Sequence, residues 1–322
     1  MLAADIRDAA PAHASHPLHA PDRIWPETNC YIDLWIELLH VRGLVPEAML
    51  GFTLRAAFEG DQFGFLKPHA ADLERLYGLE TQELALYETL EAHSLVQVAR
   101  GHPVLVEVDA FHLPDTRGTT YRRESSKTTI AILGLDPEAR RLDYIHNGGR
   151  YALEAADYAG LFATAPLPPY AEFVKTGGPA LPEADLPVAA LGLLRAHRAR
   201  APRSNPVRAL REDLERRGDA FVQRPLTAFH RYAFNTTRQL GANFELLGSH
   251  LAWLAARGMG GLDPAAEAAT RLAGEAKTFQ FQLARAFSRG RIAGLSERLA
   301  PAEATYAAVF AFLDDALAAL PD

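Results

Sequence analysis

The stretch Trp25-Pro26-Glu27-Thr28-Asn29-Cys30-Tyr31-Ile32-Asp33-Leu34-Trp35 holds the only cysteine of the chain and places it where a helix is expected to begin. Asn29 is a capping-type residue, and apolar residues then recur at helical spacing until Gly43. A thiol in a first helical turn lies among unpaired backbone N–H groups, which favours the thiolate that attacks carbonyls and thioesters. Cys30 is therefore a candidate nucleophile, and a small buried hydrophobic residue is the alternative.

The composition is that of an ordinary soluble globular chain, with 48% hydrophobic and 23% charged residues. Its 322 residues are enough for two domains, and a single cysteine excludes an intrachain disulfide framework. The net charge of -7 argues against general nucleic-acid binding. No apolar run is long enough to span a membrane, and the start lacks a signal-peptide pattern. We therefore expect a cytoplasmic protein with no nucleic-acid or membrane partner.

The first 22 residues are rich in Ala, His and Pro and show no apolar periodicity, so a flexible arm is predicted there. His13, His16 and His19 are evenly spaced but have no rigid frame, and no metal site is expected. After the arm, a Pro- and Gly-rich segment separates two regions of different pattern. We predict an α+β domain over 23–170, a linker over 171–185 and an all-α helical bundle over 186–322.

Within these domains the pattern predicts individual elements. A long helix is expected from 80 to 98 and a strand over 103–111. Strands over 128–135 and 141–147 flank a turn at 136–139 and so predict a hairpin. The apolar periodicity of the second half predicts helices over 186–200, 206–216, 219–257, 264–289 and 301–319. Glycines such as Gly218 are expected to lie between these helices.

A helix-start cysteine followed by strands that carry polar residues is the element order of papain-like enzymes, whose sheet supplies a base and a group to orient it. His146 and His112 are the candidate bases, and Asn147 and Asp115 are the candidate orienting groups. Alternation along the strand sends His146 and Asn147 to opposite faces, so only one of them can point at Cys30. Each histidine can equally be a hydrogen-bonded structural residue.

Gln62 is the candidate oxyanion-hole donor. It lies in the run Glu59-Gly60-Asp61-Gln62-Phe63-Gly64, where a side-chain amide in a Gly-flanked loop can stabilise a tetrahedral intermediate. The alternative is that the amide only satisfies backbone groups of its own loop.

Several runs stand out as a set, at 59–63, 106–111 with 113–116, 127–132, 144–149, 238–242 and 277–285. Together they resemble an uncharacterised bacterial domain-of-unknown-function family over nearly the whole chain. Members of that family tend to be encoded beside seryl-tRNA-synthetase-like ligases that load amino acids onto carrier proteins. More remotely, the first half is similar to the cysteine-peptidase-like domain of the butirosin-type acyltransferase, which moves an acyl group from a carrier-protein thioester to an amine.

The resemblance implies acyl transfer through Cys30 rather than proteolysis. In papain-like relatives the catalytic histidine begins the strand that reads Thr128-Thr129-Ile130 here, and it is expected near 125, where this chain has Ser125. Serine cannot act as the base, so another histidine substitutes, the thiol works without a full triad, or this copy is inactive. A thioester donor makes a weak base less damaging, because it is already activated.

The second half carries polar residues on otherwise apolar helices. Arg238, Glu245, Lys277 and Arg285 form either a buried structural ion-pair network or an acceptor pocket for a carboxylate or phosphate. Carrier proteins are typically acidic, and a local positive cluster in this acidic chain is expected to dock one; a solvated helical face is the alternative. The cluster consists of Arg195, Arg198, Arg200, Arg203 and Arg208.

The preferred prediction is a papain-like first domain, a helical second domain and acyl or aminoacyl transfer from a carrier-protein phosphopantetheine thioester to a small-molecule acceptor. Cys30 would take the acyl group, and no cofactor would be bound. One rival is a cysteine peptidase or amidase that uses the same residues. The other is a non-catalytic carrier-protein binding partner, which a structure without an imidazole in hydrogen-bond reach of Cys30 would favour.

Overall fold

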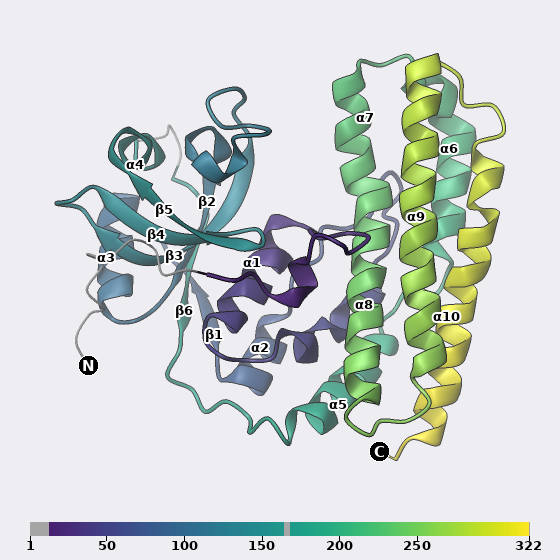
Figure 1. Cartoon of the computed structure of the whole chain (residues 1–322), viewed down its shortest axis with the longest axis horizontal. Coiled ribbons are helices and arrows are strands. Elements are labelled where there is room, and N and C mark those ends of the chain that lie inside the picture. Colours follow the sequence, from purple (N-terminus) through teal and green to yellow (C-terminus); the bar gives the residue numbers. More distant parts are fainter. Residues whose placement is uncertain (1–12, 164–167, 322) are drawn as a thin grey trace. The chain divides into compact units, whose positions relative to one another are not determined.

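The computed structural model describes residues 13–163 and 168–321, which fall into two compact units (Figure 1). Among the described residues, unit 1 contains 13–20, Asn29–Val45 and His69–Leu181, apart from 164–167. Unit 2 contains Pro21–Thr28, Pro46–Pro68 and 182–321. The chain therefore passes between the units several times before its C-terminal half begins.

Unit 1 is built on a six-stranded sheet in the order β1-β6-β2-β3-β4-β5, in which all neighbouring strands are antiparallel. Its central strands are rich in Val, Ile and Leu, whose side chains pack well on a pleated surface. The predicted hairpin is confirmed as β3 and β4. The strands are β1 (Glu80–Glu83), β2 (Val104–Asp109), β3 (Lys127–Asp136), β4 (Arg141–His146), β5 (Gly149–Glu154) and β6 (Ala171–Lys175).

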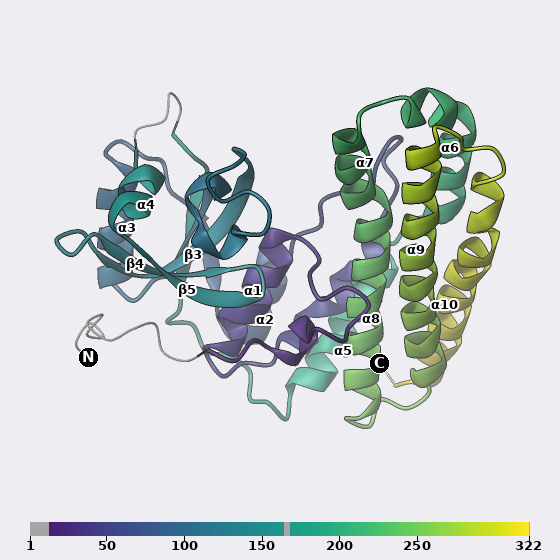
Figure 2. The same ribbon diagram turned by 45° about the horizontal axis from the view of Figure 1, so that its top comes forward.

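Helices lie on both faces of this sheet (Figure 2). On one face, β2, β3 and β4 contribute Val106, Ile130 and Tyr144 to an apolar cluster, and helices α3 and α4 pack against it. On the other face, α1 packs against β3, β4 and β5 and is buried along almost its whole length. The helices of unit 1 are α1 (Cys30–His40), α2 (Ala70–Tyr77), α3 (Leu90–Ala99) and α4 (Ala155–Leu161), with short 3-10 turns at Pro17–His19, Ala110–His112 and Pro114–Thr116.

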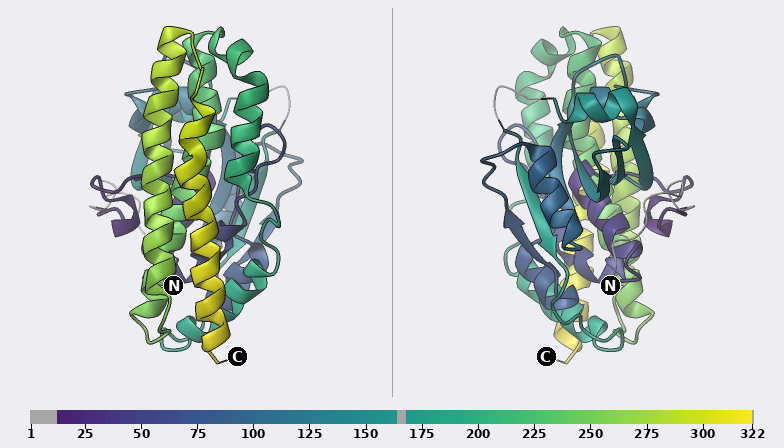
Figure 3. Two further views of the ribbon diagram at one scale, coloured as in Figure 1. Left: turned by 90° about the vertical axis from the view of Figure 1, so that its right-hand side faces the viewer. Right: turned by 90° about the vertical axis from the view of Figure 1, so that its left-hand side faces the viewer.

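Unit 2 is helical, and its long helices α8, α9 and α10 pack side by side, with α9 and α10 prominent in the left view of Figure 3. Each carries an apolar stripe of Leu, Phe and Ala residues that is buried against its neighbours. The helices are α5 (Leu186–Arg198), α6 (Pro206–Val222), α7 (Leu226–Ala233), α8 (Gln239–Ala255), α9 (Asp263–Arg289) and α10 (Ala300–Ala319). The unit also contains the 3-10 helices η2 (Pro46–Arg55) and η6 (Ser296–Leu299) and the π-helical turn η5 (Phe234–Arg238).

The predicted order of a mixed α/β region followed by a helical region is confirmed, but two elements differ. The expected helix over 80–98 is wrong at its start, because Glu80–Glu83 pairs with β6 as strand β1. The expected single helix over 219–257 is interrupted near Pro225, which lacks a backbone N–H. Gly218 does not end a helix but lies inside α6, where a Cβ would come within 2.5 Å of the Ile292 side chain.

The predicted domain limits also need correction. The expected linker over 171–185 contains strand β6, which pairs with β1 and β2. Residues 46–68 belong to unit 2, because η2 packs against α5 and α8. The flexible arm expected over 1–22 does not hold for 13–20, where His16 and Leu18 are buried; residues 1–12 lie outside the described part of the chain.

Across residues 13–163 and 168–321, no helix combines the length and the apolar character that crossing a bilayer requires.

Candidate functional site

Cys30 is the first residue of α1, as the sequence predicts. The Asn29 side chain caps the helix by accepting hydrogen bonds from Tyr31 N at 3.1 Å and Ile32 N at 3.0 Å. The thiol is partly exposed, and its Sγ lies 3.8 Å from the Thr129 hydroxyl of β3, in hydrogen-bonding geometry. Within the described part of unit 1, the residue bonded to the thiol is therefore a threonine and not a histidine.

His146, at the end of β4, is held by a chain of hydrogen bonds. Its Nδ1 lies 2.6 Å from Asp115 Oδ2, and its Nε2 lies 2.8 Å from the Thr128 hydroxyl. The Tyr144 hydroxyl donates to the other oxygen of Asp115. Burial and the Asp115 charge raise the pKa of Tyr144, so its hydroxyl keeps the proton that it donates. Asp115 thus orients this imidazole, in the pairing that the sequence suggested.

The Cys30 and His146 contacts are made by two consecutive residues of β3. Side chains of consecutive strand residues point to opposite faces of a sheet, so Thr129 faces α1 and Thr128 faces away from it. The structure does not bring His146 to Cys30, because the strand lies between them. The sequence pattern places both residues near β3 but does not reveal which face each one occupies.

Asn147 and His112 take other positions. Asn147 has a φ of 47° in the tight turn that joins β4 to β5, a left-handed conformation that asparagine tolerates better than most residues. Asp115, not Asn147, is the partner of His146 Nδ1. His112 ends a 3-10 turn and packs over Gly160, where a Cβ would collide with the imidazole ring.

His112 lines a cavity of about 970 Å³ in unit 1, which no local sequence pattern indicates. Ser125, at the position where a histidine was expected, lies at this cavity and donates to Asp109. Burial raises the pKa of Asp109, but hydrogen bonds from Ser125, Phe111 N and Ser126 N outweigh it, so the pKa is lowered. Lys127 Nζ pairs with Glu107 at 2.6 Å. The partners in each of these two pairs satisfy each other at the cavity wall, whereas His112 Nδ1 is buried without a hydrogen-bond partner among the described residues.

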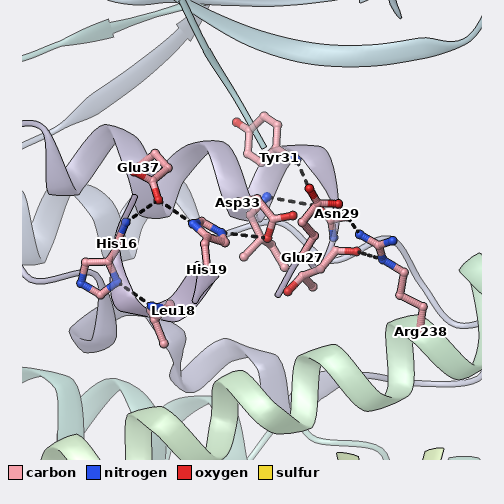
Figure 4. A network of polar contacts seen from close by, with 11 residues as sticks. His16, Leu18, His19, Glu27, Asn29, Tyr31, Asp33, Glu37 and Arg238 are labelled. Carbon is pink, nitrogen blue, oxygen red and sulfur yellow. Dashed lines mark hydrogen bonds and ion pairs between the residues drawn. The ribbon is translucent and has the colours of Figure 1, made fainter. Parts of the chain in front are cut away.

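A histidine and carboxylate network joins residues 13–19 to α1, and Figure 4 shows its centre. Glu37 lies 2.6 Å from His13 Nε2 and 2.5 Å from His19 Nδ1, and it accepts from the His16 backbone N–H at 2.9 Å. His19 Nε2 lies 3.6 Å from Asp33. Among the described residues no group of histidine, cysteine and carboxylate side chains has the arrangement of a metal site.

In unit 2, three of the predicted substrate-binding residues instead hold the segment 23–28. Glu245 accepts from the backbone N–H groups of Ile24 at 3.1 Å and Trp25 at 2.7 Å. Arg238 donates to Thr28 O and pairs with Glu27 at 3.2 Å (Figure 4). The Lys277 ammonium lies 4.0 Å from the Trp25 ring centre. These contacts give Arg238, Glu245 and Lys277 a structural role in holding this segment. Arg238 and Glu245 make ion pairs with Glu27 and Arg23, respectively, rather than with each other.

The surroundings of Lys277 also shift the pKa of its ammonium group. Burial and the nearby Arg238 charge lower its pKa, and Glu245 partly opposes them. Arg285, the fourth predicted residue, lies near the C-terminal end of α9, beside a separate hollow. Gln62 is exposed in a loop of unit 2, where its backbone carbonyl accepts from Glu59 N at 2.7 Å.

The arginines expected to dock a carrier protein are largely engaged within unit 2. Arg195 donates to backbone carbonyls at the C-terminal end of α10. Arg198 pairs with Asp314 at 2.7 Å, and Arg208 pairs with Glu303 at 2.5 Å. Of the other two, Arg200 follows α5 and donates to the Ala196 carbonyl of that helix at 3.2 Å, and Arg203 is exposed between α5 and α6.

Models of known protein families match both halves of the sequence. The model of the DUF1839 N-terminal domain matches residues 14–176, and the model of the DUF1839 C-terminal domain matches residues 183–315. No curated protein matches the chain. The two matches follow one another along most of the sequence, so the chain belongs to the DUF1839 family.

Proposed function

We propose that this protein transfers an acyl or aminoacyl group from a thioester to an acceptor, and that Cys30 carries the group between the two steps. The observation behind the proposal is the position of Cys30, partly exposed at the capped start of α1 and beside the Thr129 hydroxyl. A helix-start cysteine packed on an antiparallel sheet also supports a papain-like arrangement for unit 1. The donor we propose is the phosphopantetheine arm of an acidic carrier protein.

The chemistry of the first step is thiol–thioester exchange. The Cys30 thiolate attacks the acyl carbon, a new C–S bond forms, and the bond to the pantetheine sulfur breaks. The departing thiolate takes up a proton to replace the one that Cys30 gave to solvent. In the second step an amine of the acceptor attacks the Cys30 thioester, loses its proton and releases the Cys30 thiol. Neither step requires a bound cofactor.

Thr129, whose hydroxyl is hydrogen-bonded to the thiol, can assist this exchange. Its hydroxyl accepts a hydrogen bond from the thiol, and the same hydroxyl can donate to the thiolate once the proton has left. A threonine cannot take the proton as a base does. The proposal therefore depends on an activated donor such as a thioester, and it disfavours an amide substrate and hence a peptidase.

The test is intact-mass spectrometry after incubation with an aminoacyl-pantetheine thioester. We expect an added aminoacyl mass on the native protein and none on Cys30→Ala. We expect His146→Gln to retain the adduct, because His146 lies on the opposite face of β3 from Cys30. Loss of the adduct in His146→Gln with the fold intact would favour a histidine-dependent mechanism instead.

A second candidate is hydroxyl chemistry at Thr128. The order Thr128 hydroxyl, His146 imidazole, Asp115 carboxylate has the spacing of a nucleophile, a base and an orienting group. Thr128 is only about 9% exposed, so this candidate requires the end of β3 to open to substrate. An ester adduct on Thr128 that persists in Cys30→Ala would establish it.

The same experiment separates catalysis from binding alone. If no variant forms an adduct while titration with an aminoacyl-loaded carrier protein still shows binding, the protein is a non-catalytic binding partner. The threonine beside Cys30, where papain-like enzymes use a histidine, is the feature that favours this outcome.

A further inference from the structure

A hollow rimmed by four arginines lies at the C-terminal end of α9. Its volume is about 340 Å³, and α9 contributes Arg285 and Arg289 to it. Arg291 follows α9 directly, and Arg298 belongs to the 3-10 turn η6. The apolar residues Ala286, Ile292, Ala293 and Leu295 also line it.

These four guanidinium groups have no carboxylate partner among the described residues, and no carboxylate lines the hollow. Between 282 and 298 the sequence holds a single acidic residue, Glu297, which is exposed and does not line it. Gln282 adds a buried Oε1 that has no hydrogen-bond partner. The hollow is therefore positively charged, and the Gln282 Oε1 beside it has no hydrogen-bond partner in the described part of the chain.

Other arginines of unit 2 behave differently. Arg198, Arg208 and Arg217 each pair with an aspartate or glutamate of the same unit. One basic residue in the last turn of a helix is explained by the helix dipole. That explanation does not extend to Arg291 and Arg298, which lie beyond the last turn of α9 and face the same hollow.

We infer that this hollow binds the phosphate group of a ligand. A guanidinium fork matches the oxygens of phosphate in paired hydrogen bonds. A phosphate monoester carries about -1.5 to -2 charges near pH 7, so it offsets more of the arginine charge in a small volume than one carboxylate does. The apolar side chains of Ile292 and Leu295 in the lining suit the carbon skeleton next to the phosphate.

Two sources of this phosphate are compatible with the hollow: a free phosphorylated small molecule, and the phosphopantetheine arm of a carrier protein. The second source depends on the proposed function, whereas phosphate binding itself does not. Pyrophosphate is therefore the first probe, since it tests the hollow without reference to Cys30. Pantetheine 4′-phosphate, compared with pantetheine, then identifies the source.

The experiment is calorimetric titration of the full chain with pyrophosphate at low and high salt. We expect binding that weakens with salt and falls at least about tenfold in the double variant Arg289→Gln, Arg291→Gln. Arg271→Gln is the matched control, because Arg271 is exposed on α9 and does not line the hollow. Circular dichroism of each variant checks that the fold is intact.

Equal affinity in the native protein and the folded double variant would overturn the inference, as would the absence of pyrophosphate binding at low salt. If pantetheine 4′-phosphate binds and pantetheine does not, the carrier arm is the supported source. If pyrophosphate binds and pantetheine 4′-phosphate does not, the site takes a different phosphorylated molecule. In that case the proposed acyl transfer is still judged by Cys30 labelling alone.

Discussion

The imidazole of His19 lies between two carboxylates of α1. Its Nδ1 is 2.5 Å from Glu37, and its Nε2 is 3.6 Å from Asp33 (Figure 4). Burial lowers the pKa of His19, but the hydrogen bonds and charges of Asp33 and Glu37 outweigh burial and raise the pKa to about 9. The same contacts lower the pKa of Glu37 against the effect of its own burial. At neutral pH the protonated imidazole therefore ties the segment 13–20 to α1.

This network predicts a pH dependence of stability. The folded-state pKa of His19 lies above the ordinary value of 6.5, so its stabilisation is complete below pH 6.5 and is lost as the pH rises through about 9. Over that window we expect the free energy of unfolding to fall by on the order of 3 kcal/mol. Urea denaturation at a series of pH values would measure this fall.

The control for this prediction is a second histidine variant. His19→Gln should remove most of the pH dependence between 6.5 and 9, whereas His230→Gln, at an exposed position of α7, should keep it. An unchanged slope in His19→Gln would show that other groups cause the loss of stability.

At the scale of elements, helix α8 depends on a close approach at Gly241. The Trp25 indole fills the space that a Cβ at Gly241 would occupy, and its Nε1 donates to Ala273 O of α9 at 3.0 Å. One small residue thus lets a side chain from the segment 21–28 fit between two helices. Glu245, one turn further along α8, holds the backbone of the same segment.

We expect Gly241→Ala to destabilise the protein by about 1–3 kcal/mol, because the indole cannot move without breaking its hydrogen bond. Gly192→Ala is the matched control, since Gly192 lies in α5 with open space around its Cβ position. That control should be neutral or stabilising by up to about 1 kcal/mol, because alanine favours helix. Denaturant midpoints measure both, and equal midpoints for the two variants would contradict this account of Gly241.

At the scale of the whole molecule, the family domains and the compact units divide the chain differently. The C-terminal domain model matches 183–315, whereas unit 2 also contains Pro21–Thr28 and Pro46–Pro68. From this early part, η2 buries Leu50, Phe52 and Leu54, and Glu47 O accepts from His250 Nδ1 at 2.7 Å. The helical unit is therefore completed by residues that precede most of unit 1 in the sequence.

We predict that a fragment of residues 182–322 does not form the native helical unit alone. Without η2 and the segment 21–28, apolar surface of α5, α8 and α9 would be exposed. The fragment should therefore keep its helical far-UV circular dichroism but lose its near-UV signal, and it should bind a hydrophobic dye. Adding residues 1–181 in trans should restore the near-UV signal. A sharp cooperative unfolding transition of the fragment alone would contradict the prediction.

Local signals in the sequence determined several features correctly. The cap at Asn29 placed Cys30 at the start of α1, because capping depends on residues next to one another. The hairpin of β3 and β4 followed from β-branched runs around a turn, and the long helices followed from apolar periodicity. Strands β1, β5 and β6 were missed. Strands β1 and β6 are stabilised by pairing with strands distant in sequence, whereas β5 pairs with the neighbouring β4.

Only the tertiary structure decided which candidate residues meet. Asp115 reaches His146 from a 3-10 turn 31 positions away, and the pair lies on the opposite face of β3 from Cys30. Because a strand alternates with a period of two, one position along β3 separates the contact of Cys30 from that of His146. Likewise, the sequence alone does not tell which arginines have an acidic partner. Arg198 pairs with Asp314, whereas Arg291 lines a hollow that contains no carboxylate among the described residues. Local composition determines charge, but partners depend on packing between segments far apart in the chain.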